Sequence, residues 1–573
     1  MNMLYVVQNL HLFLLLIGPL VFFHELGHFL VAKWCHVKVL KFSLGFGPRL
    51  IGFVKGETTY VISLIPLGGY VKMLGENPDE HVAIEDRHRT FQAQKMYRRA
   101  AIVIAGPLAN MLLAWVVYLG LSLAPQTDAP AQIGIVLSQG AADKAGLLAQ
   151  DVILSVNHQP IQYWSQLQRI IQQSTSPVWL QVKRGDRIFE LSVQPEVVLE
   201  PDELGQKKNQ GKLGISLSYL RAVVDVSDMQ SPAYLAGLRT GDEITRINDV
   251  SVDSFESLSK ALKHVLMAQP QANTHIRVHY RRYHLGAPIK DLDIAQKQEE
   301  TSTTLVWSVG RSMPTEHLKD AHVRAEPAEV YLGFYSYDAR VAKVAPGSVA
   351  EKTGLLVGDR LLFVNQKPVH SFWFDLAALN ASTSVQNVDL VIQRGNEIKT
   401  LHAQWQVAAM SDEFKSTRSV HYFGAENDVH GMATPSVKYQ LSWLRAVSLS
   451  FHKLYDMTAL TLRGLYYLVS GRIALSQVGG PVMLFVVAEK TAQFGVAAFM
   501  SAMAVISINL GVMNLLPVPV LDGGHLMFML LALFKRQEIS DAYKMHAIRV
   551  GFVLLMALMV LAFHNDIVRF ILG

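Results

Sequence analysis

Two histidines and a glutamate in the first apolar stretch have the spacing of a metal-dependent hydrolase site. His24, Glu25 and His28 form an H-E-x-x-H pattern. On a helix, residues four apart lie on one face, so both imidazoles can reach one Zn²⁺ ion. Glu25 lies about 100° round the helix, where its carboxylate can take a proton from the attacking water. An ionisable residue at the centre of an apolar span costs about 2.5–3.5 kcal/mol, which favours a functional site over two surface histidines and a snorkelling glutamate.

A third metal ligand is expected, because a catalytic zinc site usually has three protein ligands and one open position. In the late apolar stretch 491–534 the only acidic residue is Asp522, which is followed by a glycine pair. The loop charges described below place Asp522 at the same depth as the H-E-x-x-H residues. His525 remains an alternative ligand. We favour Asp522 because the glycine pair beside it can open the helix.

The composition indicates a membrane protein with a substantial soluble part. The chain has 573 residues, of which 50% are hydrophobic and 17% charged, and this length is too great for one core. The net charge of +5 is small, and the basic residues lie beside apolar runs, which argues against nucleic-acid binding. The single cysteine, Cys35, excludes an intramolecular disulfide and a thiol-rich metal site.

Four apolar stretches are long enough to cross a bilayer, which takes about 20 residues. We assign 1–34, 100–124, 491–534 and 545–565 to transmembrane helices. The third stretch exceeds one span, so part of it is expected to be interfacial or broken at its prolines. The first stretch lacks a basic leader and a cleavage site, and is therefore predicted to be a retained helix.

The lysine and arginine bias predicts the orientation in the membrane. Basic residues are frequent in the segment 35–99, and the loop after the third span contains Lys535, Arg536 and Lys544. Both segments are therefore predicted to be cytoplasmic, and 125–490 lies outside. The zinc site is then expected toward the cytoplasmic face.

The outer segment contains an internal repeat, in which Gly-Leu is followed by Asp five residues after the Gly and by Asn six residues later. Its sets are Gly146/Asp151/Asn157, Gly237/Asp242/Asn248 and Gly354/Asp359/Asn365. This pattern resembles the PDZ domain, in which a peptide adds a strand beside a binding loop. We predict PDZ-like domains at 128–199, 211–308 and 328–408, with peptide-binding loops at Gly134, Gly214 and Gly333. Structural spacers remain the alternative. Residues 435–490 are predicted to form amphipathic helices that lie on the outer membrane surface or clamp the core.

The motifs at both ends of the chain resemble the site-2 protease family. H-E-x-x-H in the first span is combined with N-x-x-P-x-P-x-L-D-G at 514–523. Three further matches are G-F-G-P at 45–48, P-L-G-G-Y-V-K at 66–72 and G-P-L-A-N at 106–110. The outer segment matches less well, because the family members that this chain resembles have two PDZ domains and three are counted here.

The resemblance implies roles for individual residues. His24, His28 and Asp522 would hold one Zn²⁺ per chain, with Glu25 as the general base. The residues implied to hold the substrate are Asn514, Pro517, Pro519, Gly68, Gly69 and Tyr70. The segment 57–73 would be a membrane-associated β-hairpin within the cytoplasmic segment 35–99, and Gly68-Gly69 is its expected turn. An extended substrate could pair with the edge of this hairpin.

The predicted fold class is a multi-pass α-helical membrane protein with about four transmembrane helices, a membrane-associated β-hairpin and tandem α+β PDZ-like domains. The predicted function is that of an intramembrane zinc metalloprotease in the inner membrane of a Gram-negative bacterium, with periplasmic PDZ domains. Its expected substrates are single-span proteins, such as an anti-sigma factor of the sigma-E stress response, and remnant signal peptides, cut after a first periplasmic cleavage. The alternatives are a non-catalytic PDZ scaffold with a structural metal, and a metal transporter, against which the lack of further intramembrane carboxylates argues.

Overall fold

The chain folds into two compact units, which are described separately. The membrane unit comprises Met1–Gln126, Ser411–Ser416 and Tyr439–Gly573, and the repeat unit comprises Thr127–Met410 and Thr417–Lys438. A computed structural model describes residues 3–572 apart from 76–81, 138–139, 203, 227, 269–273, 283–300, 308–331, 333, 366, 370–371, 373–375, 377–385, 396, 406, 412–416, 422, 428–431 and 538.

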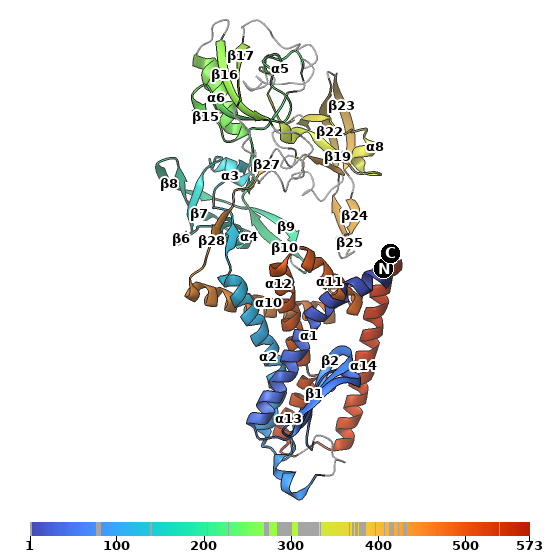
Figure 1. The fold of residues 1–573 in the computed structure, drawn as a ribbon. Coiled ribbons are helices and arrows are strands. Elements are labelled where there is room, and N and C mark those ends of the chain that lie inside the picture. Colours follow the sequence, from blue (N-terminus) through green and yellow to red (C-terminus); the bar gives the residue numbers. More distant parts are fainter. Residues whose placement is uncertain are drawn as a thin grey trace. The chain divides into compact units, whose positions relative to one another are not determined.

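The membrane unit is built mainly of long helices (Figure 1). Among the described residues, four helices are long and apolar enough to cross a membrane, namely Asn9–Trp34, Met96–Leu123, Val496–Asn514 and Ala542–Phe570. The elements at the two ends of the chain are α1 (Met3–Trp34), β1 (Val39–Lys55), β2 (Thr58–Met73), the 3-10 helix η1 (Ile84–Arg89), α2 (Met96–Leu123), α10 (Trp443–Val469), η6 (Leu475–Gln477), α11 (Pro481–Gln493), α12 (Val496–Asn514), α13 (Asp522–Lys535), α14 (Asp541–Ile567) and the π-helical turn η7 (Val568–Leu572).

Glycines allow helix α2 to pack closely against its neighbours α1 and α12. A Cβ added at Gly27 of α1 would lie 2.3 Å from the carbonyl oxygen of Ala105, and one at Gly511 of α12 would lie 3.0 Å from that of Pro107. Such small residues are favoured at helix contacts in membranes because the backbones can approach. Helix α14 is different, since Val550 is 71% and Val553 67% exposed, as expected of side chains that face lipid.

The predicted third span is broken at its prolines, which is one of the two possibilities that its excess length leaves open. Helix α12 ends at Asn514 and α13 begins at Asp522, so 491–534 is not one continuous helix. Pro517 and Pro519 in the link cannot donate the backbone hydrogen bonds that a continuous helix requires. Helix α11 runs three residues beyond the predicted boundary, to Gln493, and buries Ala488 against α1, so it packs on the core, which is the second of the two expected positions.

The two long strands β1 and β2 form a hairpin in which the chain reverses twice. The first reversal is at Gly56, which has a φ of +62°. Ser43 of β1 is registered with both Val61 and Tyr70, and 41–44 run parallel to 59–62 but antiparallel to 69–72. The two stretches of β2 therefore run in opposite directions, so the chain also turns near the predicted Gly68-Gly69, where Gly68 has a φ of +101°.

Ion pairs attach the hairpin turn to helix η1. Arg89 donates to Glu57 at 2.7 Å, and Lys38 donates to Asp86 at 2.5 Å. The hydrogen bonds from Arg89 and Lys38 hold the pKa of the Glu57 and Asp86 carboxyls below their usual range. The contact between Arg89 and Glu57 is solvent-exposed and that between Lys38 and Asp86 is half-buried, so each contributes little to the stability of the chain.

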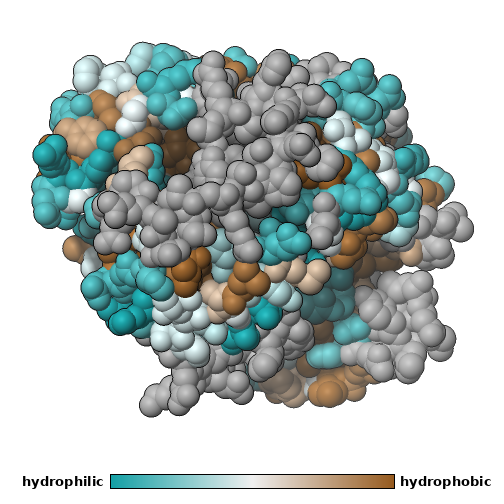
Figure 2. All heavy atoms as spheres, turned by 90° about the horizontal axis from the view of Figure 1, so that it is seen from above, coloured by the Kyte–Doolittle hydropathy of each residue, from teal (hydrophilic) through white to brown (hydrophobic). Residues whose placement is uncertain are grey.

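The chain between α2 and α10 is rich in short strands. Three four-stranded sheets have the same order, namely β6-β5-β7-β8, β15-β14-β16-β17 and β21-β20-β22-β23. In Figure 2 the coloured residues are mainly hydrophilic, with groups of hydrophobic residues among them. The described elements are β3 (Gln126–Asp128), β4 (Ile135–Val136), α3 (Ala141–Lys144), β5 (Val152–Val156), β6 (Gln159–Pro160), α4 (Trp164–Gln173), β7 (Val178–Arg184), β8 (Arg187–Val193), β9 (Glu196–Pro201), β10 (Lys207–Lys212), β11 (Ile215–Ser216), β12 (Tyr219–Leu220), β13 (Val224–Asp225), α5 (Pro232–Leu235), β14 (Asp242–Ile247), β15 (Val250–Ser251), α6 (Phe255–Ala268), β16 (Thr274–Arg282), β17 (Thr301–Trp307), β18 (Tyr335–Ser336), η4 (Tyr337–Ala339), β19 (Val341–Val344), α8 (Val349–Lys352), β20 (Arg360–Val364), β21 (Lys367–Pro368), β22 (Gln386–Arg394), β23 (Glu397–Trp405), β24 (Val407–Ser411), β25 (Thr417–His421), β26 (Ala425–Asn427), β27 (Met432–Ala433) and β28 (Val437–Tyr439).

Each repeat is closed by a strand that lies later in the chain than the sequence pattern indicates. Leu213 belongs to the core formed by 129–193, Phe334 to the core formed by 222–305, and Phe423 to the core formed by 341–403. The predicted boundaries 128–199, 211–308 and 328–408 therefore end each domain too early. Spacing along the chain cannot show this, because it does not say which neighbouring repeat a short strand pairs with.

The repeated Gly-Asp pair has a shared structural role that involves an arginine. In the second repeat, Arg282 donates to both carboxylate oxygens of Asp242, at 2.7 and 2.8 Å, and to the carbonyl of Gly237 at 2.9 Å. The same arrangement, an arginine that donates to both carboxylate oxygens of the repeated aspartate and is called a bracket from here on, joins Arg184 to Asp151 and Arg394 to Asp359. Hydrogen bonding to these aspartates raises the pKa of each guanidinium.

The second and third repeats are joined by a buried ion pair. Arg360 donates to Asp225 at 2.8 Å, and both side chains are 3% exposed. The guanidinium of Arg360 also lies 3.8 Å from the ring centroid of Tyr335. A fully desolvated and doubly satisfied arginine favours one geometry between these two repeats.

The brackets lead to a prediction of stability. Replacing Arg282 by Met is expected to destabilise the second repeat by about 2 kcal/mol, because Asp242 would stay buried without its charged partner. Hydrogen–deuterium exchange of β14 and β16 in the full chain measures this. The exposed neighbour Arg281 replaced by Met serves as the matched control. Equal exchange in the two variants would show that the bracket contributes nothing.

The predicted fold class is confirmed. The chain has four candidate spans, a hairpin of long strands and tandem small sheets of the PDZ type.

Candidate metal centre

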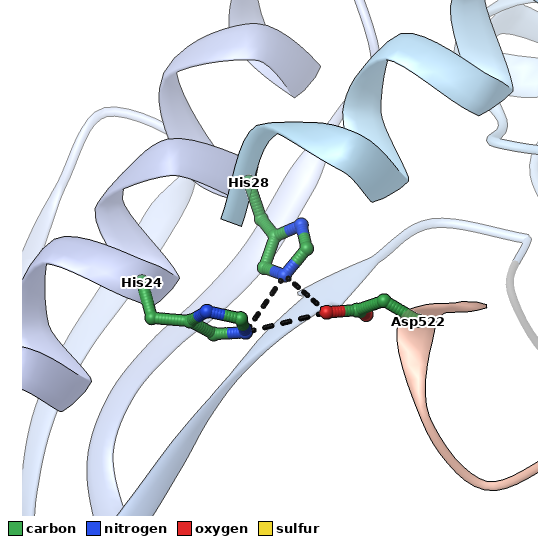
Figure 3. Close-up of side chains that lie close together, drawn as sticks. All are labelled: His24, His28 and Asp522. Atoms are coloured by element: carbon green, nitrogen blue, oxygen red, sulfur yellow. Dashed lines mark hydrogen bonds and ion pairs between the residues drawn. The ribbon is translucent and has the colours of Figure 1, made fainter. Parts of the chain in front are cut away.

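Three predicted ligand atoms meet at one point in the membrane unit. The Nε2 atoms of His24 and His28 lie 3.3 Å apart, and each lies near Oδ2 of Asp522, at 3.4 and 3.5 Å (Figure 3). These three side chains form a group that could hold a metal ion, and no other such group of His, Cys, Asp and Glu is found among the described residues. The His pair comes from one turn of α1, and the carboxylate comes from the first turn of α13.

The donor set and its spacing fit zinc. Zn²⁺ prefers imidazole and carboxylate ligands, and in a tetrahedral site with bonds of about 2.0–2.1 Å the ligand atoms stand about 3.3–3.4 Å apart. The three measured separations of 3.3, 3.4 and 3.5 Å agree with this value. Three protein ligands also leave a fourth position for water or substrate, as a catalytic site requires.

Helix α2 holds His28 in the orientation that a metal requires. Nδ1 of His28 donates to the carbonyl of Ile102 at 2.8 Å, so the proton resides on Nδ1 and the Nε2 lone pair faces the centre. Gly106 provides the space, because a Cβ at this position would lie 2.2 Å from Nε2 of His28. The His28 ring is therefore held by the carbonyl of Ile102, and the missing side chain of Gly106 leaves room for it.

The link before α13 positions Asp522. A Cβ at Gly523 would lie 2.1 Å from the carbonyl oxygen of Leu516, and one at Gly524 would lie 2.3 Å from that of Val518. The link therefore folds tightly onto the first turn of α13, and only glycine fits beside it. His525, the alternative ligand, is exposed and is not part of the metal-ligand group.

Two asparagines contact His24. Nδ2 of Asn514, at the end of α12, lies 3.2 Å from Nε2 of His24. Asn110 of α2 lies on the opposite edge of the ring, with its Nδ2 3.4 Å from Nδ1. The predicted substrate-binding residue Asn514 thus lies at the metal centre itself.

The predicted base Glu25 is buried and lies against strand β2. Its side chain is 8% exposed, and a Cβ at Gly69 would lie 2.8 Å from Cγ of Glu25. Gly69 therefore lets the strand backbone pass directly beside the general-base candidate. Gly68 and Tyr70 lie on either side of it, and both contact the ring of Phe46.

Pro517 and Pro519 line a different part of the same region. They lie on one wall of a hollow of about 420 Å³, whose other wall is formed by residues of α14. The lining residues are Pro517, Val518, Pro519, Tyr543, His546, Ala547, Val550, Gly551 and Leu554. The last of these link residues, Pro519, precedes Asp522 by three residues, so the link that leads to Asp522 also lines an apolar recess.

The predicted peptide-binding loops at Gly134 and Gly214 both belong to the first repeat. Gly134 lies directly before β4 and donates to the carbonyl of Ser216 in β11 at 2.7 Å. Gly214 has a φ of +73° and lies next to Leu213 of the same core. The assignment of Gly214 to the second domain is therefore wrong, because the closing strand comes last in each repeat, and peptide binding at either glycine stays a prediction. Gly333 lies outside the described residues.

The roles of Gly106 and Asn110 were not predicted. Both belong to the G-P-L-A-N motif, which was noted only as a match to the family. Gly106 and Asn110 are four residues apart and therefore lie on one face of α2. This spacing is the feature of the sequence that could have indicated that both residues face the same neighbour.

The fold and the site together define a membrane-embedded protein with a His/His/carboxylate centre of the metallopeptidase type. The family model described as Peptidase family M50 matches residues 12–558, so the chain belongs to this family of zinc metalloproteases. The chain is 26% identical to regulator of sigma-E protease RseP of Escherichia coli K12, covering 99% of this chain and 100% of the relative. It is 28% identical to Protease RseP of Yersinia pestis, with the same coverage.

The comparison with solved structures matches a shorter region. The PDZ domain of the SdrC-like protein from Listeria monocytogenes is 18% identical and covers 16% of this chain and 86% of its own, with a TM-score of 0.13. The predicted enzyme class, a zinc metallopeptidase, is confirmed by the family.

Proposed function

We propose that this chain cleaves single-span membrane proteins inside the bilayer, after a first cut has shortened their outer part. The proposed substrates are an anti-sigma factor and remnant signal peptides. The link to a sigma factor is supported by the name of one relative, regulator of sigma-E protease RseP. The observation that carries the proposal is the meeting of three donor atoms, 3.3–3.5 Å apart, between two apolar helices.

His24, His28 and Asp522 would hold one zinc ion per chain. When bound there, zinc supplies Lewis-acid activation of water and of a peptide carbonyl. Glu25 takes the proton of the attacking water and later gives it to the leaving amine. The Asn514 amide, next to the metal ligands, is placed to donate to the carbonyl oxygen as charge develops there.

Strand β2 is proposed to present the substrate to Glu25. A transmembrane helix hides its peptide bonds in its own hydrogen bonds, so the segment to be cut must become extended. The stretch 69–73 of β2 is paired with 39–44 of β1, and its backbone passes Glu25 at Gly69. An extended segment aligned along this strand brings its peptide bond to the base and the metal ligands. The recess lined by Pro517 and Pro519 would receive its neighbouring apolar side chains.

In the proposed orientation, the repeats select substrates on one side of the membrane and the peptide bond is cleaved toward the other side. The basic segments 35–99 and 535–544 would be cytoplasmic, so the metal centre lies toward the cytoplasmic face of a Gram-negative inner membrane. The repeats would be periplasmic and act as a filter for substrates that have already been shortened. We extend the PDZ-like assignment to the third repeat because it has the same sheet order and the same Asp359–Arg394 bracket as the others.

The test compares two neighbouring residues. Asp522→Ala is expected to weaken zinc binding by more than about 100-fold, since even the loss of a ligand's hydrogen-bond partner costs 10–100-fold. His525→Ala is the matched control and should bind zinc as the wild type does. Both variants are purified in full length and reconstituted in liposomes with a single-span reporter.

The expected result is cleavage within the span by the wild type and by His525→Ala, and none by Asp522→Ala. Zinc loss in His525→Ala, or unchanged affinity in Asp522→Ala, would contradict the ligand set. A wild-type protein that holds zinc but leaves a shortened single-span reporter intact would contradict the proposed substrate class.

A further inference from the structure

Asn110 occupies a buried position between three helices of the metal centre. It lies on α2, is 0% exposed and faces Nδ1 of His24 on α1. From α12, the hydroxyl of Ser507 donates to the backbone carbonyl of Asn110 at 2.8 Å. Gly511 of α12 lies close by, since a Cβ there would be 3.7 Å from Cβ of Asn110. The backbone and Cβ of Asn110 are therefore fixed against α12, and its carboxamide is directed at His24.

The hydrogen-bond roles at this contact conflict if His24 is a metal ligand. His24 directs Nε2 at the centre, and an imidazole that binds a cation through the Nε2 lone pair carries its proton on Nδ1. The atom facing Nδ1 is Nδ2 of Asn110, at 3.4 Å, which is also a donor. Two donors facing each other form no hydrogen bond.

A second observation on the Asn110 side chain indicates how this conflict between two donors is resolved. Oδ1 of Asn110 is buried and, within the described part of the chain, has no hydrogen-bond partner. The oxygen and nitrogen of a carboxamide have the same shape, so a half-turn about the last bond exchanges them in the same space. After this exchange the acceptor oxygen faces the Nδ1 proton of His24.

We infer that Asn110 presents its carboxamide oxygen to Nδ1–H of His24 and is a positioning residue of the metal centre. It fixes the tautomer and ring plane of His24, as the carbonyl of Ile102 does for His28. This inference rests on the proposed zinc site. The two ligands of α1 are then oriented by successive turns of one helix, α2.

A purely structural role explains the residue poorly. A buried carboxamide with one unpaired end costs stability relative to an apolar side chain of similar volume. Leucine at this position would remove the unpaired group and retain the packing between α1, α2 and α12. The amide is useful here only because it orients the imidazole.

The test uses two replacements that separate the acceptor from the donor. Asn110→Leu has neither, and is expected to weaken zinc binding about 10–100-fold. Asn110→Asp has acceptors only, and is expected to bind zinc within several-fold of the wild type. The affinity of the full-length protein in detergent is measured with zinc and a competing chelator. Ser122→Ala is the control, because Ser122 is also buried on α2 and its hydroxyl has no partner among the described residues.

Thermal unfolding of the metal-free proteins provides the readout that a structural role would move. The midpoints of Asn110→Leu and Ser122→Ala are both expected to equal or exceed that of the wild type, because each change removes a buried unpaired group, and Ser122→Ala should leave zinc affinity unchanged. Unchanged zinc affinity in Asn110→Leu would overturn the inference. So would an equal loss in Asn110→Asp, which would make Nδ2 the important atom, or a lowered metal-free midpoint in Asn110→Leu. Absence of zinc binding by the wild type would instead contradict the proposed metal site itself.

Discussion

Replacing Glu25 by Gln is expected to slow peptide cleavage by about 10²–10⁴-fold, the usual contribution of a general base. Gln has the same shape and keeps the contact with Gly69, but its amide cannot take a proton from water. Zinc affinity should persist, because Glu25 is not one of the three residues whose donor atoms meet. Cleavage of a reporter in liposomes and zinc content are measured on the same preparation.

The control for this variant is Glu57→Gln, which removes an exposed carboxylate paired with Arg89. That change should leave both quantities close to the wild type. A Glu25→Gln protein that cleaves at the normal rate would contradict the assignment of the base. One that loses zinc would show that Glu25 acts by holding the metal ligands, and that the proton passes through another group.

The helical spacing of His24 and His28, together with the costly placement of Asp522 in an apolar run, was sufficient to predict from the sequence that these three side chains meet. Their proximity was predictable because each signal is local: a period of four residues, or one charge among apolar neighbours. The break between α12 and α13 was foreseeable for the same reason, since two prolines in three residues cannot continue a helix.

What failed depends on which segments pair or pack in space. The closing strand of each repeat, marked by Leu213 in the first, follows a linker and pairs back with its own repeat. The contact of Gly69 with Glu25 joins a strand to a helix more than 40 residues away. A short strand or a lone glycine has no periodicity that identifies its partner, so the sequence alone left these contacts open.

Replacing Gly106 by Ala is expected to abolish zinc binding while leaving the helices folded. The added methyl would lie 2.2 Å from Nε2 of His28, which is the ligand atom itself. The imidazole must therefore swing away from the centre and break its hydrogen bond to Ile102. The helix does not suffer, because Ala is a better helix former than Gly by about 1 kcal/mol. We expect zinc affinity to fall by more than about 100-fold, since a ligand and its partner are both lost.

Gly120 provides a matched control on the same helix. A Cβ at Gly120 has no neighbour within 4 Å, so Gly120→Ala makes the same chemical change without touching the site. Chelator competition and thermal unfolding of the metal-free proteins are measured for both variants. If both raise the metal-free midpoint and only Gly106→Ala loses zinc, the difference comes from His28 alone. Equal zinc affinity in the two variants would mean that His28 reaches the metal from another rotamer, and the geometry of the centre would have to be revised.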